Sequence, residues 1–224
     1  MPELMVTMDD GAAIHVVTTD GDGPAAVLLH DLDCSLPYWD DVVRRLLQLD
    51  ADLNIVAVDL RGHGGSTSVE EPSRKRLVKD VKRVCRSLGL EAPVLVGHGW
   101  GADVAMACDF AGSVVAINPL MGRGPAAIEG DLERPPHMRG AQSEALLRAC
   151  TIGATTAKPL RRSKRDVPLA LLYADPADVQ ALAGSDALEQ ALEAMRFQAG
   201  SRHLPLEMPN AIAAILLSWI EEVA

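Results

Sequence analysis

The chain has no excess of positive charge and no long apolar run, and these two absences exclude several classes of protein. Its 224 residues carry 21 Lys and Arg against 31 Asp and Glu, which gives a formal net charge of -10. Because nucleic-acid backbones are bound by clustered Lys and Arg, we expect no nucleic-acid partner. No apolar run approaches the roughly 18 to 20 residues that a bilayer-spanning helix needs, so no membrane partner is expected either.

The sequence also lacks a leader-like start and paired cysteine spacing. Residues Met1–Thr7 contain no positive stretch followed by an apolar segment, and they lead directly into Asp9 and Asp10. This start predicts a cytoplasmic protein. No CxxC spacing occurs among Cys34, Cys85, Cys108 and Cys150. We therefore expect neither a metal site nor a disulfide framework, and three of the thiols are predicted to act as small hydrophobic groups.

Short apolar runs alternate with stretches of helical period along the chain. The Asp9-Asp10-Gly11 turn between Leu4–Met8 and Ala12–Thr18 predicts an antiparallel hairpin. Runs typical of strands buried on both faces follow at Ala25–His30, Asn54–Leu60, Ala92–His98, Ser113–Leu120 and Val167–Ala174. Helices are predicted at Tyr38–Leu49, Arg74–Leu88, Gly101–Phe110, around Ala177–Met195 and at Pro209–Val223. This alternation predicts βαβ crossovers and a mainly parallel sheet with helices on both faces.

Length and composition predict a single α/β domain over residues 1–224, because a chain of this size with 48% hydrophobic residues can bury a sizeable core. Residues 121–165 differ from the rest in being richer in Gly, Pro and charge, with one expected helix at Gln142–Cys150. We interpret them as a short, lid-like insertion of minimal size.

Four motifs occur in order in the chain. They are VLLHD followed by Trp39, DLRGHGGS at Asp59–Ser66, LVGHGWGA at Leu95–Ala102 and HLPLEMP at His203–Pro209. Together they resemble the α/β-hydrolase superfamily, most closely its esterase, perhydrolase and epoxide-hydrolase-like branch. The resemblance covers nearly the whole chain and implies the α/β-hydrolase fold, with about eight strands and a pocket at the carboxyl ends of the parallel ones.

The segment Gly97-His98-Gly99-Trp100-Gly101 is similar to the family's G-x-S-x-G nucleophile elbow, with glycine at the middle position. In the family, that position supplies the Ser, Cys or Asp atom that forms the covalent intermediate. Glycine supplies no such atom, and it tolerates positive φ, which costs other residues about 1 to 3 kcal/mol. We therefore predict that ordinary nucleophile chemistry is absent at Gly99. His98 and Trp100 are predicted to line the pocket, or Trp100 to pack beside the elbow.

The oxyanion loop departs from the family pattern as well. The family usually has His-Gly here, with backbone N–H groups that stabilise a developing negative charge, whereas this chain has His30-Asp31-Leu32-Asp33. A carboxylate at Asp31 or Asp33 would repel an oxyanion. Alternatively, both side chains point to solvent and the backbone donors are intact. His30, Asp31 and Leu32 are our candidates for substrate contacts.

His203 is the best match to the family's catalytic base, because it follows a strand-like stretch at Met195–Gly200 and precedes the last helix. A shift of one residue in this register would place Arg202 at the base position and remove the base.

The acid member of the family's triad follows the strand predicted at Val167–Ala174, and Asp175 and Asp178 are the candidates. Ala177 can occupy the usual acid position instead, in which case both carboxylates belong to a solvated loop. Replacement nucleophiles are conceivable elsewhere, at Ser66, Ser35 and Cys34, but Ser66 belongs to a family loop that usually shapes the sheet edge.

A dinucleotide-binding fingerprint is the competing interpretation of Gly97-x-Gly99-x-x-Ala102. It requires an Asp or Glu about 20 residues onward to hold a ribose. Ile117-Asn118-Pro119 stands there instead, so we expect no cofactor.

These observations favour an α/β-hydrolase homologue without competent nucleophile chemistry, whose pocket binds a small apolar or ester-like ligand or none. The rival enzyme hypothesis is an esterase-like hydrolase in which His98 or His203 activates water directly. A third hypothesis is a scaffold that binds another protein. Monomer and homodimer are both expected oligomeric states for this architecture.

Overall fold

The computed structural model describes residues 1–32, 34–67, 73–120, 167–174, 193–199, 201 and 203–222. Its strands form one eight-stranded sheet in the order β1-β2-β4-β3-β5-β6-β7-β8. The strands are β1 (Glu3–Thr7), β2 (Ala13–Thr18), β3 (Ala25–Leu29), β4 (Asn54–Val58), β5 (Val94–His98), β6 (Ser113–Ile117), β7 (Leu169–Tyr173) and β8 (Glu193–Arg196).

The sheet is parallel from β4 through β8, and only β1 and β2 run antiparallel to their neighbours. The predicted hairpin at the start is confirmed, with Thr7 opposite Ala13 and Gly11 at φ 81° in the turn. The predicted mainly parallel sheet is confirmed as well. Parallel strands end at the same edge of a sheet, so the loops after β3 and β5 meet there.

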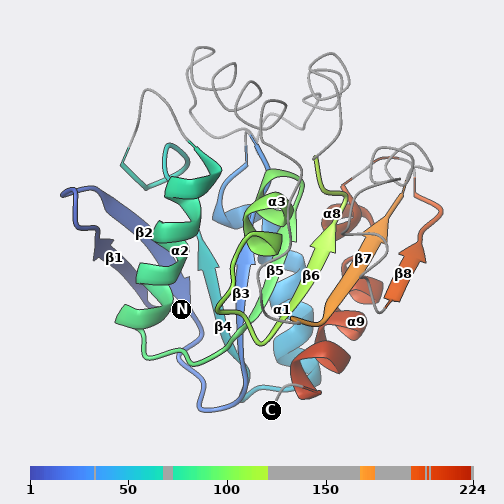
Figure 1. The fold of residues 1–224 in the computed structure, drawn as a ribbon. Coiled ribbons are helices and arrows are strands. Elements are labelled where there is room, and N and C mark those ends of the chain that lie inside the picture. Colours follow the sequence, from blue (N-terminus) through green and yellow to red (C-terminus); the bar gives the residue numbers. More distant parts are fainter. Residues whose placement is uncertain are drawn as a thin grey trace.

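Helices cover both faces of the sheet, as the sequence predicted (Figure 1). The face in front in Figure 1 carries α2 (Arg74–Ser87) and α3 (Trp100–Met106), and the other face carries α1 (Asp40–Leu49) and α9 (Pro209–Glu221). Two short elements complete the set, the 3-10 helix η1 (Leu36–Trp39) before α1 and α8 (Leu204–Glu207) before α9.

The alternation of side chains along β3 shows how one strand serves two cores. Val27 and Leu29 belong to the cluster beneath α2 and α3, whereas Ala26 and Leu28 belong to the cluster beneath α1 and α9, and all four are fully buried. This pattern explains why the central strands appear as continuous apolar runs in the sequence.

The last strand corrects one sequence-based prediction. The helix expected around Ala177–Met195 does not extend to its predicted end, because Glu193–Arg196 form β8. Parallel pairing with β7 across Ala170–Tyr173 provides hydrogen-bond partners that decide the conformation of this segment. The expected helix at Gln142–Cys150 and the lid-like insertion at 121–165 lie outside the described residues.

Three cysteines are buried with free thiols, Cys34, Cys85 and Cys108, in agreement with their predicted role as small hydrophobic groups. Burial raises the pKa of Cys85 to about 12, so this thiol is protonated at neutral pH. In the described part of the chain, no helix combines the length and apolar character needed to cross a membrane.

Arg61 joins three segments through ion pairs in the loop that follows β4. Its guanidinium donates to both carboxylate oxygens of Asp80 on α2, each at 2.7 Å, and to Asp10 of the β1–β2 turn at 2.9 and 3.3 Å. Arg61 is 3% exposed, so these carboxylates compensate the cost of burying its charge.

His63 belongs to the same loop and is buried, and the described part of the chain provides no ion pair to it. Its Nδ1 lies 3.2 Å from the carbonyl oxygen of Arg61, and its ring centroid is 5.1 Å from that of His30. Burial, followed by the neighbouring His30, lowers the pKa of His63 from 6.5 to about 3. The imidazole is therefore neutral at pH 7, with Nδ1–H donating to Arg61.

We expect Asp80→Ala to lower the free energy of unfolding by about 3 kcal/mol, because the buried guanidinium of Arg61 would lose its bidentate partner. Urea unfolding measures the change. The control is Asp41→Ala, which breaks the exposed ion pair with Arg44 and should cost less than about 1 kcal/mol. Equal losses in the two variants would contradict the assigned role of Arg61.

The low pKa of His63 predicts that the folded protein loses stability in acid. The unfolded chain binds a proton near pH 6.5 that the folded chain accepts only near pH 3, so stability should fall as pH drops through this window. The contribution of one group is at most about 1.4 kcal/mol per pH unit. His63→Gln, which cannot titrate, should show a shallower decline in urea unfolding measured across this range. Parallel profiles for the two proteins would rule the explanation out.

Candidate active site

The turn between β5 and α3 has the strained geometry of a nucleophile elbow. Gly99 has φ 54° and ψ -115°, and it begins α3 by accepting hydrogen bonds from the backbone N–H groups of Ala102 and Asp103. The positive φ expected at this glycine is therefore present. Gly101 is required for a different reason, because a Cβ there would lie 2.2 Å from the carbonyl oxygen of Leu29. The helix thus crosses directly over the end of β3.

The carboxylate of Asp31 lies against this elbow. Asp31 is 2% exposed, and its Oδ1 accepts hydrogen bonds from two backbone N–H groups, that of Trp100 at 2.6 Å and that of Leu32 at 2.7 Å. In the α/β-hydrolase fold, the oxyanion hole consists of the N–H after the nucleophile and an N–H from the loop after β3. The Asp31 carboxylate therefore accepts from the two backbone N–H groups that correspond in position to those donors.

This placement decides between two expectations for the oxyanion loop. The hypothesis that the Asp31 side chain points to solvent is wrong, because the carboxylate is buried and satisfies the two donors. The backbone donors themselves are intact, as that hypothesis expected. Asp33, the second acid of the loop, lies outside the described residues.

Gly99 and Asp31 depend on each other sterically. A Cβ added to Gly99 would lie 1.9 Å from Cγ and Oδ1 of Asp31 and 2.2 Å from its Oδ2. No side chain can therefore stand at position 99 while the Asp31 carboxylate keeps its place. The glycine at position 99 and the acid at position 31, which seemed separate in the sequence, are therefore two aspects of one arrangement.

His30 holds the loop that carries Asp31. Its Nε2 accepts a hydrogen bond from the backbone N–H of Leu60 at 3.0 Å, so its Nδ1 carries the proton and donates to the carbonyl oxygen of Asp31 at 2.7 Å. The ring is fully buried. His30 thus positions the oxyanion loop by connecting it to the segment after β4.

A cluster of three aromatic and imidazole rings lies beside the elbow. Tyr38 stacks on His98 with ring centroids 5.1 Å apart, and the ring of His203 lies 5.6 Å from that of His98. The Tyr38 hydroxyl lies 3.3 Å from Nδ1 of His203, and His98 Nδ1 lies 3.7 Å from Oδ2 of Asp31. The structure therefore brings His98, His203 and Asp31 together, although they are far apart in the sequence.

Tyr38 is the member of this cluster that the sequence analysis did not single out. It stands at the beginning of a predicted helix next to Trp39, where an aromatic residue signals packing rather than chemistry. No local sequence pattern indicates the role of its hydroxyl, because the partner, His203, is 165 positions away.

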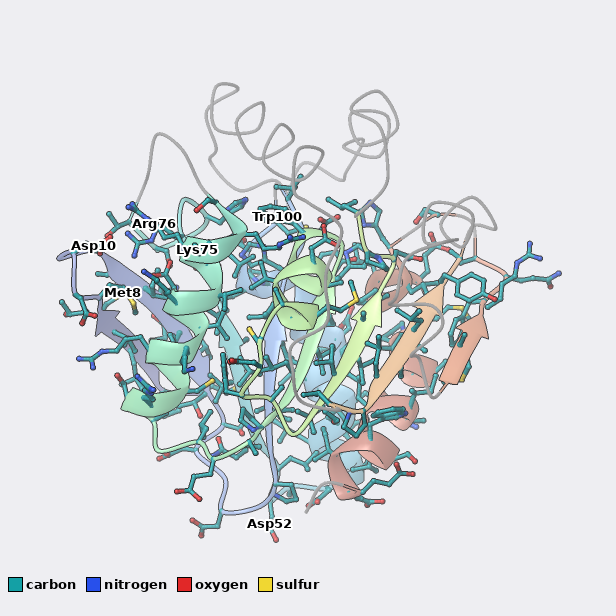
Figure 2. All side chains as sticks on the ribbon, in the orientation of Figure 1. Met8, Asp10, Asp52, Lys75, Arg76 and Trp100 are labelled. Carbon is teal, nitrogen blue, oxygen red and sulfur yellow. The ribbon has the colours of Figure 1, made fainter. Side chains whose placement is uncertain are left out.

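The remaining candidates differ in their placement. Trp100, the first residue of α3, is fully buried in the core cluster and lies at the carboxyl edge of the sheet (Figure 2), in agreement with packing beside the elbow. The Oγ of Ser66 donates to the Asp59 carbonyl at 2.6 Å and accepts from a β2 backbone N–H at 2.9 Å, so it serves the fold. The acid candidates Asp175 and Asp178 and the alternative base Arg202 lie outside the described residues.

Comparisons with known proteins agree with this architecture. A model of the alpha/beta hydrolase family matches residues 26–215. Epoxide hydrolase B of Mycobacterium tuberculosis is 38% identical over 132 residues, which are 54% of this chain and 36% of that protein. Fluoroacetate dehalogenase from a Burkholderia species is 35% identical over 108 residues, which are 45% of this chain and 34% of that protein. The matches thus span about a third of these two relatives.

Solved structures show the same fold. An esterase from Exiguobacterium antarcticum superposes with a TM-score of 0.80 at 14% identity, covering 98% of this chain and 100% of that one. The family match extends over most of the chain, and it includes the elbow, the oxyanion loop and His203. This chain therefore belongs to the alpha/beta hydrolase family.

Proposed function

We propose that this protein is a hydrolase in which the carboxylate of Asp31 replaces the elbow side chain as the attacking group. Serine-type ester hydrolysis from position 99 is then absent. One observation carries the proposal: the carboxyl group of Asp31 lies 1.9 Å from the point where a nucleophile's Cβ would stand, with Oδ1 in the oxyanion hole.

The filled oxyanion hole argues against ester substrates. A bound ester needs the N–H groups of Leu32 and Trp100 for the oxyanion that forms when its carbonyl is attacked. Oδ1 already accepts from both, and the negative charge of Asp31 would repel a second oxyanion.

The same two N–H donors would assist attack by Asp31 on a saturated carbon that bears a leaving group. If Oδ2 bonds to that carbon, Oδ1 becomes the carbonyl oxygen of the resulting ester and already lies between two N–H donors. Water addition to Cγ would then place negative charge on Oδ1, where the donors stabilise it. The curated relatives, an epoxide hydrolase and a fluoroacetate dehalogenase, have names that denote substrates of this kind.

The proposed first step forms a bond between Oδ2 and the carbon while the bond to the epoxide oxygen or halide breaks. A halide leaves as an anion, and an epoxide oxygen takes a proton from the Tyr38 hydroxyl. In the second step His203 accepts a proton from water as the water adds to Cγ. The Cγ–Oδ2 bond then breaks, and the departing alkoxide takes the proton of the hydroxyl group that was added to Cγ, so that the alcohol leaves and Asp31 is a carboxylate again. The protonated His203 returns its proton to the Tyr38 phenolate after an epoxide, or releases it to solvent after a halide.

A non-catalytic protein that binds a small apolar ligand is the second candidate function. It is favoured by the burial of Asp31, which is 2% exposed with Oδ1 accepting two hydrogen bonds. In that case, the carboxylate serves only as the hydrogen-bond acceptor for the N–H groups of Leu32 and Trp100, which no longer bind a substrate.

Single-turnover incubation in ¹⁸O-labelled water separates the two candidates. With styrene oxide or bromoacetate as probe, water attack at Cγ should place the label on Asp31, and peptide mass spectrometry should find it there. Asp31→Asn should abolish turnover, and p-nitrophenyl butyrate should not be hydrolysed. If neither probe reacts and Asp31 remains unlabelled, the non-catalytic function is supported. Label in the product alone, with Asp31→Asn still active, would favour water activated directly by His98 or His203.

Moving the carboxylate from position 31 to position 99 provides a reciprocal test. Asp31→Gly and Gly99→Asp should each reduce turnover by about 100-fold or more, the first by removing the nucleophile and the second by crowding two carboxylates. The double variant should recover to within about tenfold of the parent, a strongly non-additive result in steady-state kinetics. Additive losses would contradict the idea that the two positions share one space.

The steric exclusion also makes a prediction about stability. Gly99→Ser should lower the thermal midpoint, because its Cβ would collide with the Asp31 carboxylate and its φ of 54° is strained for serine. Adding Asp31→Gly should restore most of the loss. Scanning calorimetry of both variants measures the thermal midpoints. An unchanged midpoint in Gly99→Ser alone would show that the Asp31 carboxylate can move aside without loss of stability.

A further inference from the structure

His98 is buried in the candidate active site, and the proposed Asp31 reaction gives it no role. It is the last residue of β5, and its backbone pairs in register with Ile117 of β6. The next residue, Gly99, donates its N–H to the carbonyl oxygen of Ile117 at 2.9 Å. The sheet therefore fixes the backbone at this imidazole, whose ring has no exposed surface.

Two contacts connect the His98 ring to the two groups that act first in the proposed reaction. Its Nδ1 lies 3.7 Å from Oδ2 of Asp31, the attacking oxygen. Its face stacks on the ring of Tyr38, the proposed acid, with centroids 5.1 Å apart and an interplanar angle of 25°. One imidazole thus contacts both the nucleophile and the acid.

The contact with Oδ2 matters because the backbone fixes the other oxygen of the carboxylate. Oδ1 of Asp31 accepts from the N–H groups of Leu32 at 2.7 Å and Trp100 at 2.6 Å, and these hydrogen bonds by themselves do not fix Oδ2. Displacement at a saturated carbon requires the attacking oxygen to lie in line with the leaving group. A misplacement of about 1 Å can slow such a step about 100-fold.

The position of the proton on His98 decides whether its contact with Asp31 attracts or repels. A proton on Nδ1 places positive charge density next to Oδ2, whereas a proton on Nε2 leaves the Nδ1 lone pair there. The carboxylate therefore favours the Nδ1–H tautomer. At 3.7 Å the contact is longer than a hydrogen bond, and contacts of this kind often shorten when substrate binds.

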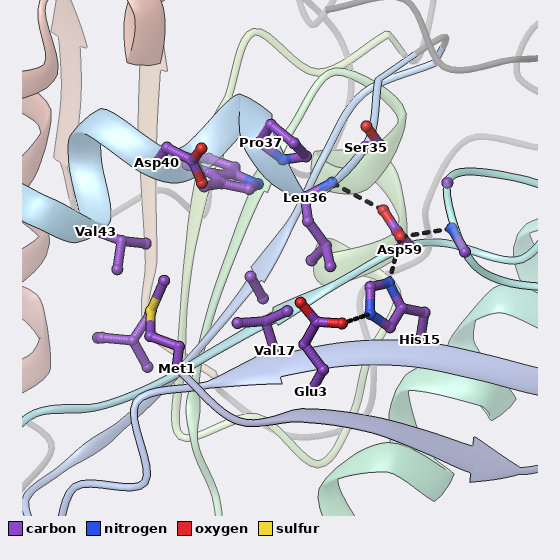
Figure 3. Close-up of a pocket in the computed structure, with 15 residues that line it drawn as sticks. Met1, Glu3, His15, Val17, Ser35, Leu36, Pro37, Asp40, Val43 and Asp59 are labelled. Atoms are coloured by element: carbon purple, nitrogen blue, oxygen red, sulfur yellow. Dashed lines mark hydrogen bonds and ion pairs between the residues drawn. The ribbon is translucent and has the colours of Figure 1, made fainter.

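The stacking contact acts on a residue whose backbone is already anchored. Oδ1 of Asp59 accepts at 2.8 Å from the backbone N–H of Leu36, the first residue of the helix η1 that carries Tyr38 (Figure 3). The ring of Tyr38 is then oriented by the imidazole of His98, and its hydroxyl lies 3.3 Å from Nδ1 of His203. Loss of the His98 ring would therefore affect the direction of the phenol.

We propose that His98 is a positioning residue for the Asp31 reaction, an inference that rests on the function proposed above. Its Nδ1–H holds Oδ2 of Asp31 in line with the carbon that it attacks, and its ring face holds the Tyr38 phenol toward the epoxide oxygen. The first contact serves epoxides and halides alike, since Oδ2 attacks both. The second serves epoxides alone, because a halide leaves without a proton.

Two variants separate these contacts. His98→Phe keeps a ring for Tyr38 but has no Nδ1–H, whereas His98→Asn loses the ring but keeps an N–H donor two bonds from Cβ, as Nδ1 is. His98→Phe should slow ester formation on Asp31 about 100-fold with both bromoacetate and styrene oxide. His98→Asn should react with bromoacetate within about tenfold of the parent, but about 100-fold more slowly with styrene oxide. Acid quench and mass spectrometry of the Asp31 peptide measure the ester in single turnovers.

A measurement without turnover tests the contact itself. Long-range ¹H–¹⁵N spectra of the histidine rings should show His98 as the Nδ1–H tautomer, its signal being assigned by its loss in His98→Phe. Asp31→Asn should shift the Nδ1 signal, because it removes the charge beside that nitrogen. Asp41→Asn, which removes an exposed carboxylate on α1, is the matched control and should leave the signal in place.

The results distinguish failure of this inference from failure of the proposed function. An Nε2–H tautomer, or an Nδ1 signal that ignores Asp31→Asn, would overturn the positioning role of His98. Ester formation in His98→Phe as fast as in the parent, or equal losses with both probes in both variants, would overturn it as well. A parent protein that reacts with neither probe contradicts the proposed function, and the positioning role falls with it.

Discussion

The hydrogen bonds from the backbone of Leu32 and Trp100 to the Asp31 carboxylate are the interaction on which the rest of the site depends. They join the loop after β3 to the first turn of α3. In other members of the fold, these donors await charge that develops on a substrate. Here the Asp31 carboxylate accepts from both donors, and the proposed chemistry follows from this arrangement.

The sheet makes this interaction possible. β3 and β5 are parallel neighbours, so their carboxyl ends bring the two loops to one place, and Gly101 allows α3 to cross close to Leu29. His30 then ties the Asp31 backbone to the segment after β4 through its two ring nitrogens. The carboxylate is therefore held in one orientation, as expected whether it attacks a substrate or only occupies the two N–H donors.

Much of the fold could be predicted, because strands buried on both faces and amphipathic helices leave strong patterns in the chain. The elbow and the oxyanion loop were located from their motifs, and the backbone conformation of Gly99 was expected from its residue type. Glu193–Arg196 were placed partly in a helix, because the pairing with β7 that makes them a strand is not a local property. Tyr38 was missed for the same reason, since its partner His203 is 165 positions away.

The sequence by itself determined the family, the order of the elements up to β7 and the absence of a nucleophilic side-chain atom at Gly99, because these follow from residue identity and local periodicity. Only the tertiary structure decided where the Asp31 carboxylate points, and that it occupies the space of the missing side chain. The direction of a side chain in a loop depends on donors brought from another strand. Such donors are set by packing across the sheet, which no local pattern records.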